Sequence, residues 1–228
     1  MISNSHSNYL FKAGTYSAVL LFAFFFAIGK VAHGQDYTFG IKAGPSYSSI
    51  IGDLTEGFKF RFSGHGGVFV HMRFSDKFAL QPEVVYSSQG FQFSTDLASI
   101  QSFSPSTDGN DFRTNVQLNF ITVPLMAQFA LNDKVAVEVG PQFGFLLNQV
   151  TKIKNLDEIN TSGVARRSSV NGDFQLDYGA ALGLAFGLNE HLFLSPRAYI
   201  GMRNRLNGLG GLAQSYNVAL QLSLNYGF

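Results

Sequence analysis

The amino-acid sequence predicts an all-β fold, an eight-stranded antiparallel up-and-down transmembrane β-barrel with short turns at one end and long loops at the other. Three observations lead to this fold class. Apolar residues alternate with small or polar residues over stretches of about 11 to 14 residues, roughly twice the usual strand length. Polar triplets separate some of these stretches at a fixed spacing. Charged residues make up 14% of the chain, well below the roughly 25% of a soluble protein.

Residues 1–34 have the order of a secretory signal peptide. Lys12 lies in a polar start, an apolar run of 11 residues follows from Ala18 to Ile28, and small residues precede Gln35. The run is shorter than the ~20 residues of a spanning helix, so we expect cleavage rather than a retained anchor. Residues 35–228 then form one barrel domain with a formal charge of (16 − 2) − 15 = −1 and no cysteine. This near balance argues against nucleic acid as a partner.

Alternation predicts eight strands in the mature chain. Val135, Val137, Val139 and every second residue to Leu147 are apolar or proline, and the intervening residues are small or polar apart from Leu146. The same reading gives strands at 36–49, 62–74, 78–93, 114–131, 135–149, 172–188, 192–203 and 215–228. Five prolines fall inside these strands: Pro45, Pro82, Pro124, Pro141 and Pro196. Because proline lacks the N–H group, we expect them at bulges, edges or weakly paired ladder positions.

The connections alternate between short and long. Three of them have three residues each, and these predicted turns are Ser75-Asp76-Lys77, Asn132-Asp133-Lys134 and Asn189-Glu190-His191. Their first residues are spaced by 132 − 75 = 57 and 189 − 132 = 57. The other connections are long and rich in Ser, Asn, Asp and Gly, and they span 50–61, 94–113, 150–171 and 204–214. The period therefore measures one hairpin plus its neighbouring long loop, as in a meander.

A two-faced meander can turn its apolar face inward, as in a soluble lipocalin-like ligand binder, or outward into lipid. The composition of the faces favours the outward arrangement, because the opposite face carries many glycines that suit a narrow interior. Strands longer than the ~9–11 residues of a bilayer crossing and the secretion signal point the same way.

Four stretches resemble the PorT-like outer-membrane β-barrel family of Bacteroidetes-type bacteria. They are "YTFGIKAGPSYSSI", "FSDKFALQPEVVYSSQG", "LNFITVPLMAQFALNDKVAVEVGPQFGFLL" and the terminal "LQLSLNYGF". The resemblance implies an eight-stranded barrel that crosses the outer membrane several times, with periplasmic short turns and external long loops. Family members are often called porins, and one branch serves protein secretion, but neither role is tied to a motif in this chain. The terminal Tyr226 and Phe228 resemble the signal that the barrel assembly machinery reads.

Period two places a set of charges inside the barrel. Glu83, Glu138 and Arg197 lie 6, 4 and 6 residues beyond Lys77, Lys134 and His191, so their depths are similar. We expect them to form an ionic layer with Lys42, which fills the lumen and is structural or gates it. Centring the hairpin on Glu190 makes paired numbers sum to 380, which predicts a second pair, Asp177 with Arg203.

No catalytic or metal-binding motif occurs in the mature chain, so neither an enzyme nor a cofactor is expected. The sequence favours a small monomeric barrel that contacts outer-membrane lipid and lipopolysaccharide. We expect it to act as a structural or interaction scaffold, with an unidentified protein partner at its external loops. Two alternatives stay open at this point: a narrow porin-like channel or transporter for small solutes, and the soluble lipocalin-like binder. An eight-stranded barrel is narrow enough to be filled by its own side chains, unlike the porins of 16 to 18 strands.

Overall fold

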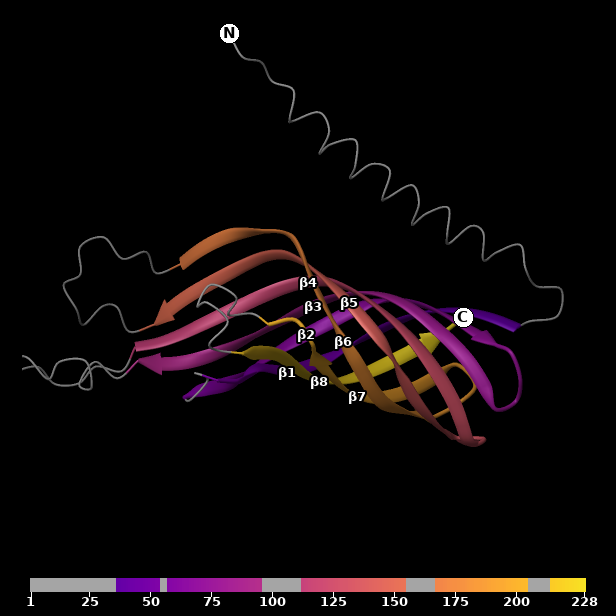
Figure 1. The fold of residues 1–228 in the computed structure, drawn as a ribbon. Coiled ribbons are helices and arrows are strands. Elements are labelled where there is room, and N and C mark those ends of the chain that lie inside the picture. The colour runs from indigo at the N-terminus through magenta and orange to yellow at the C-terminus, as the bar shows by residue number, and fades with distance from the viewer. Residues whose placement is uncertain (1–35, 54–56, 96–111, 155–166, 205–213) are drawn as a thin grey trace, which may run out of the picture. The chain divides into compact units, whose positions relative to one another are not determined.

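The computed structural model describes residues 36–53, 57–95, 112–154, 167–204 and 214–228. They form eight strands that follow one another around a closed antiparallel barrel, with β1 paired to β8 (Figure 1). The strands are β1 (Asp36–Gly52), β2 (Phe58–Arg73), β3 (Phe78–Thr95), β4 (Phe112–Asn132), β5 (Val135–Lys154), β6 (Arg167–Gly187), β7 (Leu192–Gly201) and β8 (Ser215–Gly227). The predicted fold class is confirmed. The predicted signal peptide, residues 1–34, lies outside the described residues.

The described residues include no helix that is long and apolar enough to cross a membrane.

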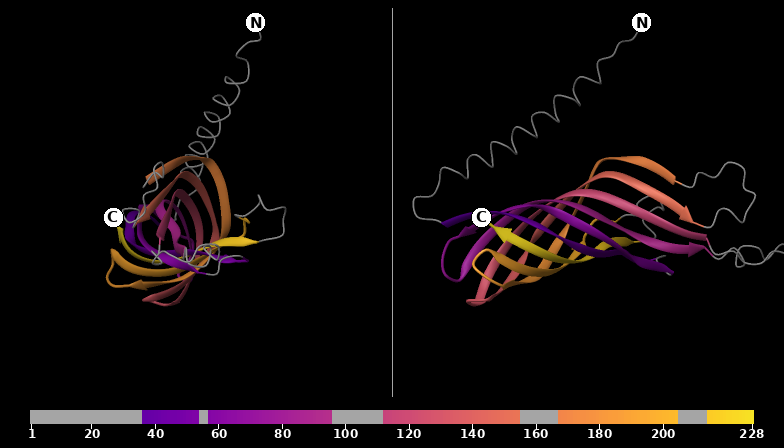
Figure 2. Two further views of the ribbon diagram at one scale, coloured as in Figure 1. Left: turned by 90° about the vertical axis from the view of Figure 1, so that its left-hand side faces the viewer. Right: turned by 180° about the vertical axis from the view of Figure 1, so that it is seen from behind.

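The barrel wall is much taller on one side than on the other. β4, β5 and β6 contain 21, 20 and 21 residues, whereas β7 and β8 contain 10 and 13. The long strands extend past the others at the loop end, as both side views show (Figures 1 and 2). Here the predicted boundaries are wrong by several residues: β5 continues to Lys154 and β6 begins at Arg167, inside the connection expected at 150–171.

A bulge explains why alternation did not reveal the start of β6. Leu146 pairs with Gln175, but Asn148 pairs with Asn171, so three residues of β6 face one residue of β5. Within the bulge Asp173 and Phe174 adopt positive φ angles of 48° and 50°, and the Asp173 amide donates to Asn171 Oδ1 at 3.2 Å. The bulge breaks the inward–outward period, so the pattern below it does not continue above it.

The three short turns are built alike. Asn132 Oδ1 accepts hydrogen bonds from the amides of Lys134 and Val135, both at 2.9 Å. Asn189 Oδ1 and Ser75 Oγ accept from the corresponding two amides of their own turns. An Asn or Ser side chain that replaces a backbone acceptor in this way is a recurrent turn device. The residues that recur at the 57-residue spacing, Ser75, Asn132 and Asn189, are therefore the ones whose side chains form the turns.

The apolar face points outward, as predicted. Phe62, Leu182 and Leu220 are 72%, 59% and 53% exposed, although they are large apolar residues within strands. At the turn end, aromatic rings contact one another around the outside: Phe74 with Phe78, Phe78 with Phe129, and Tyr226 with Phe228. Aromatic girdles of this kind lie at the membrane–water interfaces of transmembrane barrels.

The five prolines occupy weakly paired ladder positions, as one of the three predicted possibilities stated. Pro82 pairs in register with Leu125 of β4, but on its β2 side it lies in a gap of the ladder. Pro45, Pro124, Pro141 and Pro196 lie in equivalent gaps of the β1–β8, β3–β4, β4–β5 and β6–β7 ladders. The register is unchanged across each gap. A missing N–H thus removes pairing on one side without displacing the strand.

Candidate functional site: an ionic layer in the barrel lumen

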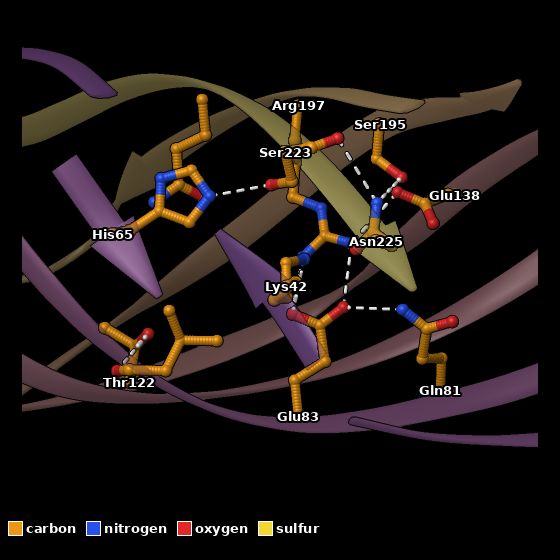
Figure 3. Close-up of polar contacts among 12 residues, drawn as sticks. Lys42, His65, Gln81, Glu83, Thr122, Glu138, Ser195, Arg197, Ser223 and Asn225 are labelled. Atoms are coloured by element: carbon orange, nitrogen blue, oxygen red, sulfur yellow. Dashed lines mark hydrogen bonds and ion pairs between the residues drawn. The ribbon is translucent and has the colours of Figure 1, made fainter. Parts of the chain in front are cut away.

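Four charged side chains meet inside the barrel, one from each odd-numbered strand. Lys42 of β1 donates to Glu83 Oε2 of β3 at 2.8 Å. Arg197 of β7 donates two hydrogen bonds of 3.0 Å to Glu83, and its Nη2 also donates to Glu138 Oε2 of β5 at 2.9 Å (Figure 3). Alternate strands supply the layer because strand tilt brings every second strand to the same depth. The contacts match the ionic layer predicted from the sequence.

The layer is closed to solvent and electrically balanced. The side chains of Lys42 and Arg197 are 2% exposed and those of Glu83 and Glu138 are 0% exposed. Two cations face two anions, which is the condition under which buried charges are tolerated. Neutral amides add further hydrogen bonds to the carboxylates. Gln81 donates to Glu83 Oε1 at 2.9 Å, and Gln128 donates to Glu138 Oε1 at 2.7 Å.

The second predicted ion pair, between Asp177 and Arg203, is wrong. The register is as expected, since Gly179 pairs with Gly201. However, β7 ends at Gly201, so Arg203 lies past the paired ladder and its guanidinium donates to the carbonyl of Leu176. Asp177 accepts hydrogen bonds from Tyr199 at 3.3 Å and from Asn217 at 3.4 Å. A matching register number therefore did not bring the two charged side chains together.

A buried histidine lies beside the ionic layer. His65 Nδ1 is 2.8 Å from Ser46 Oγ, and its Nε2 is 2.7 Å from Ser223 Oγ (Figure 3). The sequence places His65 on the inward face but gives no sign of these serine partners, because they come from β1 and β8, at the two ends of the strand order. No group of three His, Asp or Glu residues in the described part of the chain is arranged to hold a metal ion.

Apolar packing adds to the closure of the mid-lumen. Met126, Ala181, Tyr199 and Ala219 form a buried cluster of inward-facing side chains. Closer to the short turns, Phe69 is 2% exposed and packs edge-on against Phe193, with ring centroids 5.6 Å apart. A Cβ atom on Gly40 would overlap the Phe69 ring, so this glycine provides the space that the ring fills.

Two separate cavities lie at opposite ends of the lumen. The turn-end cavity, of about 250 Å³, is lined by residues of all three short turns together with His71 and Gln128. The loop-end cavity, of about 450 Å³, is lined by Phe58, Leu118, Leu146 and their neighbours. The two cavities share no lining residue, and none of the four residues of the ionic layer lines either of them.

The other predicted site residues lie at the turn end. Ser75, Asn132 and Asn189 are in exposed turns, as expected. Tyr226 and Phe228 belong to the aromatic girdle, and the Phe228 amide donates to the Phe39 carbonyl at 2.8 Å. The periplasmic position of these turns and the assembly signal remain predictions.

Comparison with known proteins identifies the family of this chain. A family model described as outer membrane protein beta-barrel domain matches residues 33–207. The chain belongs to this family. Its members are outer-membrane barrels, and the fold, the outward apolar face and this match place the chain in the outer membrane as a multi-pass protein. This result excludes the soluble lipocalin-like alternative.

One solved structure supports the fold, and a second is reported for comparison. Neisserial surface protein A is 13% identical, with a TM-score of 0.51, over 86% of this chain and 100% of that chain. Ail, the attachment invasion locus protein of Yersinia pestis, is 11% identical, with a TM-score of 0.48, over 85% and 99%. At 13% identity, the similarity to Neisserial surface protein A shows the fold alone. No curated protein matches this chain.

Proposed function

We propose that this family member is a sealed outer-membrane barrel that acts as a structural or interaction scaffold through its loop end, and not as an open channel or an enzyme. The observation that carries the proposal is the ionic layer. Arg197 joins Glu83 and Glu138 across the lumen at 2.9 to 3.0 Å, with all three side chains at most 2% exposed. A solute on the barrel axis would have to separate charges that are paired in a site without water access.

A narrow porin-like channel is the second candidate, and the two end cavities are the observation in its favour. Conduction would require Arg197 to leave at least one carboxylate so that the cavities could join. Such a movement costs several kcal/mol by the usual magnitude for breaking a buried ion pair, about 3–5 kcal/mol. A resting barrel should therefore be closed.

The tall wall of β4–β6 supports an interaction role. The β6–β7 ladder ends at Gly179, and beyond it the Tyr178 and Leu176 carbonyls still accept hydrogen bonds from Met202 and Arg203. On the N-terminal side of Leu176, β6 has no β7 ladder partner among the described residues, and we propose that a strand from another protein pairs with this part of its edge. Arg167, Ser168 and Ser169 on this edge are exposed. We propose that an unidentified protein partner binds here and at the long loops, that lipid and lipopolysaccharide surround the barrel, and that the barrel is a monomer inserted by the barrel assembly machinery.

We also place the chain in the PorT-like branch of Bacteroidetes-type bacteria. The quoted stretches that support this branch include "LQPEVVYSSQG", in which Glu83 of the ionic layer lies, and "VEVGPQFGFLL", in which Glu138 lies. Both carboxylates of the layer therefore come from the segments that carry the resemblance.

Planar-bilayer recording tests the proposal against a channel. Purified wild-type protein should give no resolved single-channel steps, whereas Arg197→Ala or Glu138→Ala should introduce small, frequent openings because the layer loses its balance. Lys152→Ala, which removes an exposed charge at the loop end, is the control and should behave as wild type. Steady wild-type conductance that changes with Arg197→Ala would show a pore and refute the scaffold.

A further inference from the structure

The loop-end cavity has an apolar wall inside a barrel lumen. Val116, Leu118, Phe120 and Leu146 form a buried cluster of β4 and β5, with Phe91 and Phe93 packed against it. Three of the four, together with Phe58, Phe91 and Ile50, line the cavity. The lumen of an outer-membrane barrel is usually polar. An apolar wall around an open volume therefore needs an explanation other than filling the barrel.

The cavity is shaped by well-packed parts of the wall. Phe58 stacks on Phe91, with ring centroids 4.7 Å apart, and the Phe93 ring lies 5.6 Å from that of Phe58. The β6 bulge contributes Asn171, Gly172 and Gln175 to the lining. The volume of about 450 Å³ is within the range of small-molecule sites, roughly 300–1,000 Å³.

Arg203 gives the cavity a positive charge. Among the described residues that line it, Arg203 is the one that carries a charge. Its guanidinium donates to the neutral carbonyl of Leu176, a contact that does not neutralise its charge. Gln149, Gln175, Asn204 and Ser215 are among the polar residues of the lining. The described part of the site therefore combines an apolar wall with the positive charge of Arg203.

We propose that the loop-end cavity binds an anionic amphiphile, a small molecule with a medium-length apolar chain and one carboxylate or similar head group. The chain lies against Leu118, Leu146 and the Phe58–Phe91 stack, and the head group binds Arg203. This binding does not depend on whether the ionic layer seals the barrel, because the layer lines neither cavity.

Methyl NMR of the full mature chain in phosphatidylcholine nanodiscs tests the proposal, with octanoate and octan-1-ol as probes. Octanoate should shift the Leu118 and Leu146 methyl resonances saturably and leave the lipid-facing methyls of Leu182 and Leu220 unchanged. Arg203→Gln should weaken octanoate binding about tenfold, as expected for one charge-assisted contact, and leave octan-1-ol binding unchanged. Gln149→Trp, a partly exposed lining position outside the apolar cluster, should block both probes.

Several results would overturn the proposal. Shifts that never saturate, or that are equal at Leu182 and Leu118, would mean partition into the bilayer only. Equal octanoate binding by wild type and Arg203→Gln would refute the proposal that Arg203 binds an anionic head group. Cross-relaxation between lipid acyl protons and the Leu118 methyls before any probe is added would show that membrane lipid fills the cavity. Because each variant is read at methyl groups, loss of the folded spectrum is recognised separately.

Discussion

Removing the Arg197 guanidinium should destabilise the barrel more than removing any exposed charge. Arg197 makes three hydrogen bonds to two fully buried carboxylates, and its side chain is 2% exposed. Arg197→Met keeps much of the volume but leaves Lys42 alone against Glu83 and Glu138, a net charge of −1 in the layer. Loss of one partner from a buried network costs about 3–5 kcal/mol, so we expect that decrease in the free energy of unfolding.

The matched control restores the balance of charge. In the double variant Arg197→Met/Glu138→Gln, Lys42 still pairs with Glu83, and the amide introduced at position 138 can still accept a hydrogen bond from Gln128. We expect this double variant to recover about half of the loss, because the uncompensated carboxylate is the costly element. Urea titration in phospholipid vesicles measures the free energy of unfolding of the single and the double variant, with circular dichroism and heat-modifiable migration as the readouts. A loss below about 1 kcal/mol for Arg197→Met, typical of a solvated surface pair, would refute the reasoning.

Three further outcomes are expected. Gly40→Ala should lower the free energy of unfolding by about 1–3 kcal/mol through overpacking. Gly66→Ala is the control and should lower it by less than about 1 kcal/mol, because the added Cβ would have no neighbour closer than 3.6 Å. Equal losses for the two variants would contradict this reasoning. Because the chain has no cysteine, Ser169→Cys should react with an impermeant maleimide on intact cells and Asp133→Cys only after permeabilisation; the reverse pattern would invert the proposed orientation. Deleting Phe228 should reduce the fraction of heat-modifiable protein in the outer membrane. If the deletion variant assembled as well as wild type, Phe228 would not be part of an assembly signal.

Much of the barrel could be predicted because one physical rule acts along the whole chain. Lipid on one side and a narrow interior on the other force a period of two, so the faces and the hairpin register centred on Glu190 follow from the sequence. Counting residues from Lys77, Lys134 and His191 gives the depth of the ionic layer, because strand tilt is nearly uniform around a barrel.

The remaining features depend on departures from that rule. The early end of β7 separates Asp177 from Arg203, and no residue pattern marks where the ladder stops. In the upper part of β4 the apolar residues change faces: Val116, Leu118 and Phe120 are buried, although lower in the strand the buried positions include Thr122 and Gln128. When apolar residues move from the outward to the inward face in this way, the period of two is kept. Alternation alone therefore does not show where in β4 the change occurs. Leu146 is the visible exception on the inward face of β5, and it belongs to the same cluster.

The prolines have a consequence for how the barrel resists opening. Each of the five interrupts a different seam between strands, and wherever a ladder on the other side is recorded, the proline is paired in register there. Five interruptions on one seam would make a hinge through which the wall could part towards lipid. Spread over five seams, each lost pairing is bridged by intact ladder above and below. Resistance to lateral parting is thus shared among these five seams, and none of them carries more than one of the interruptions.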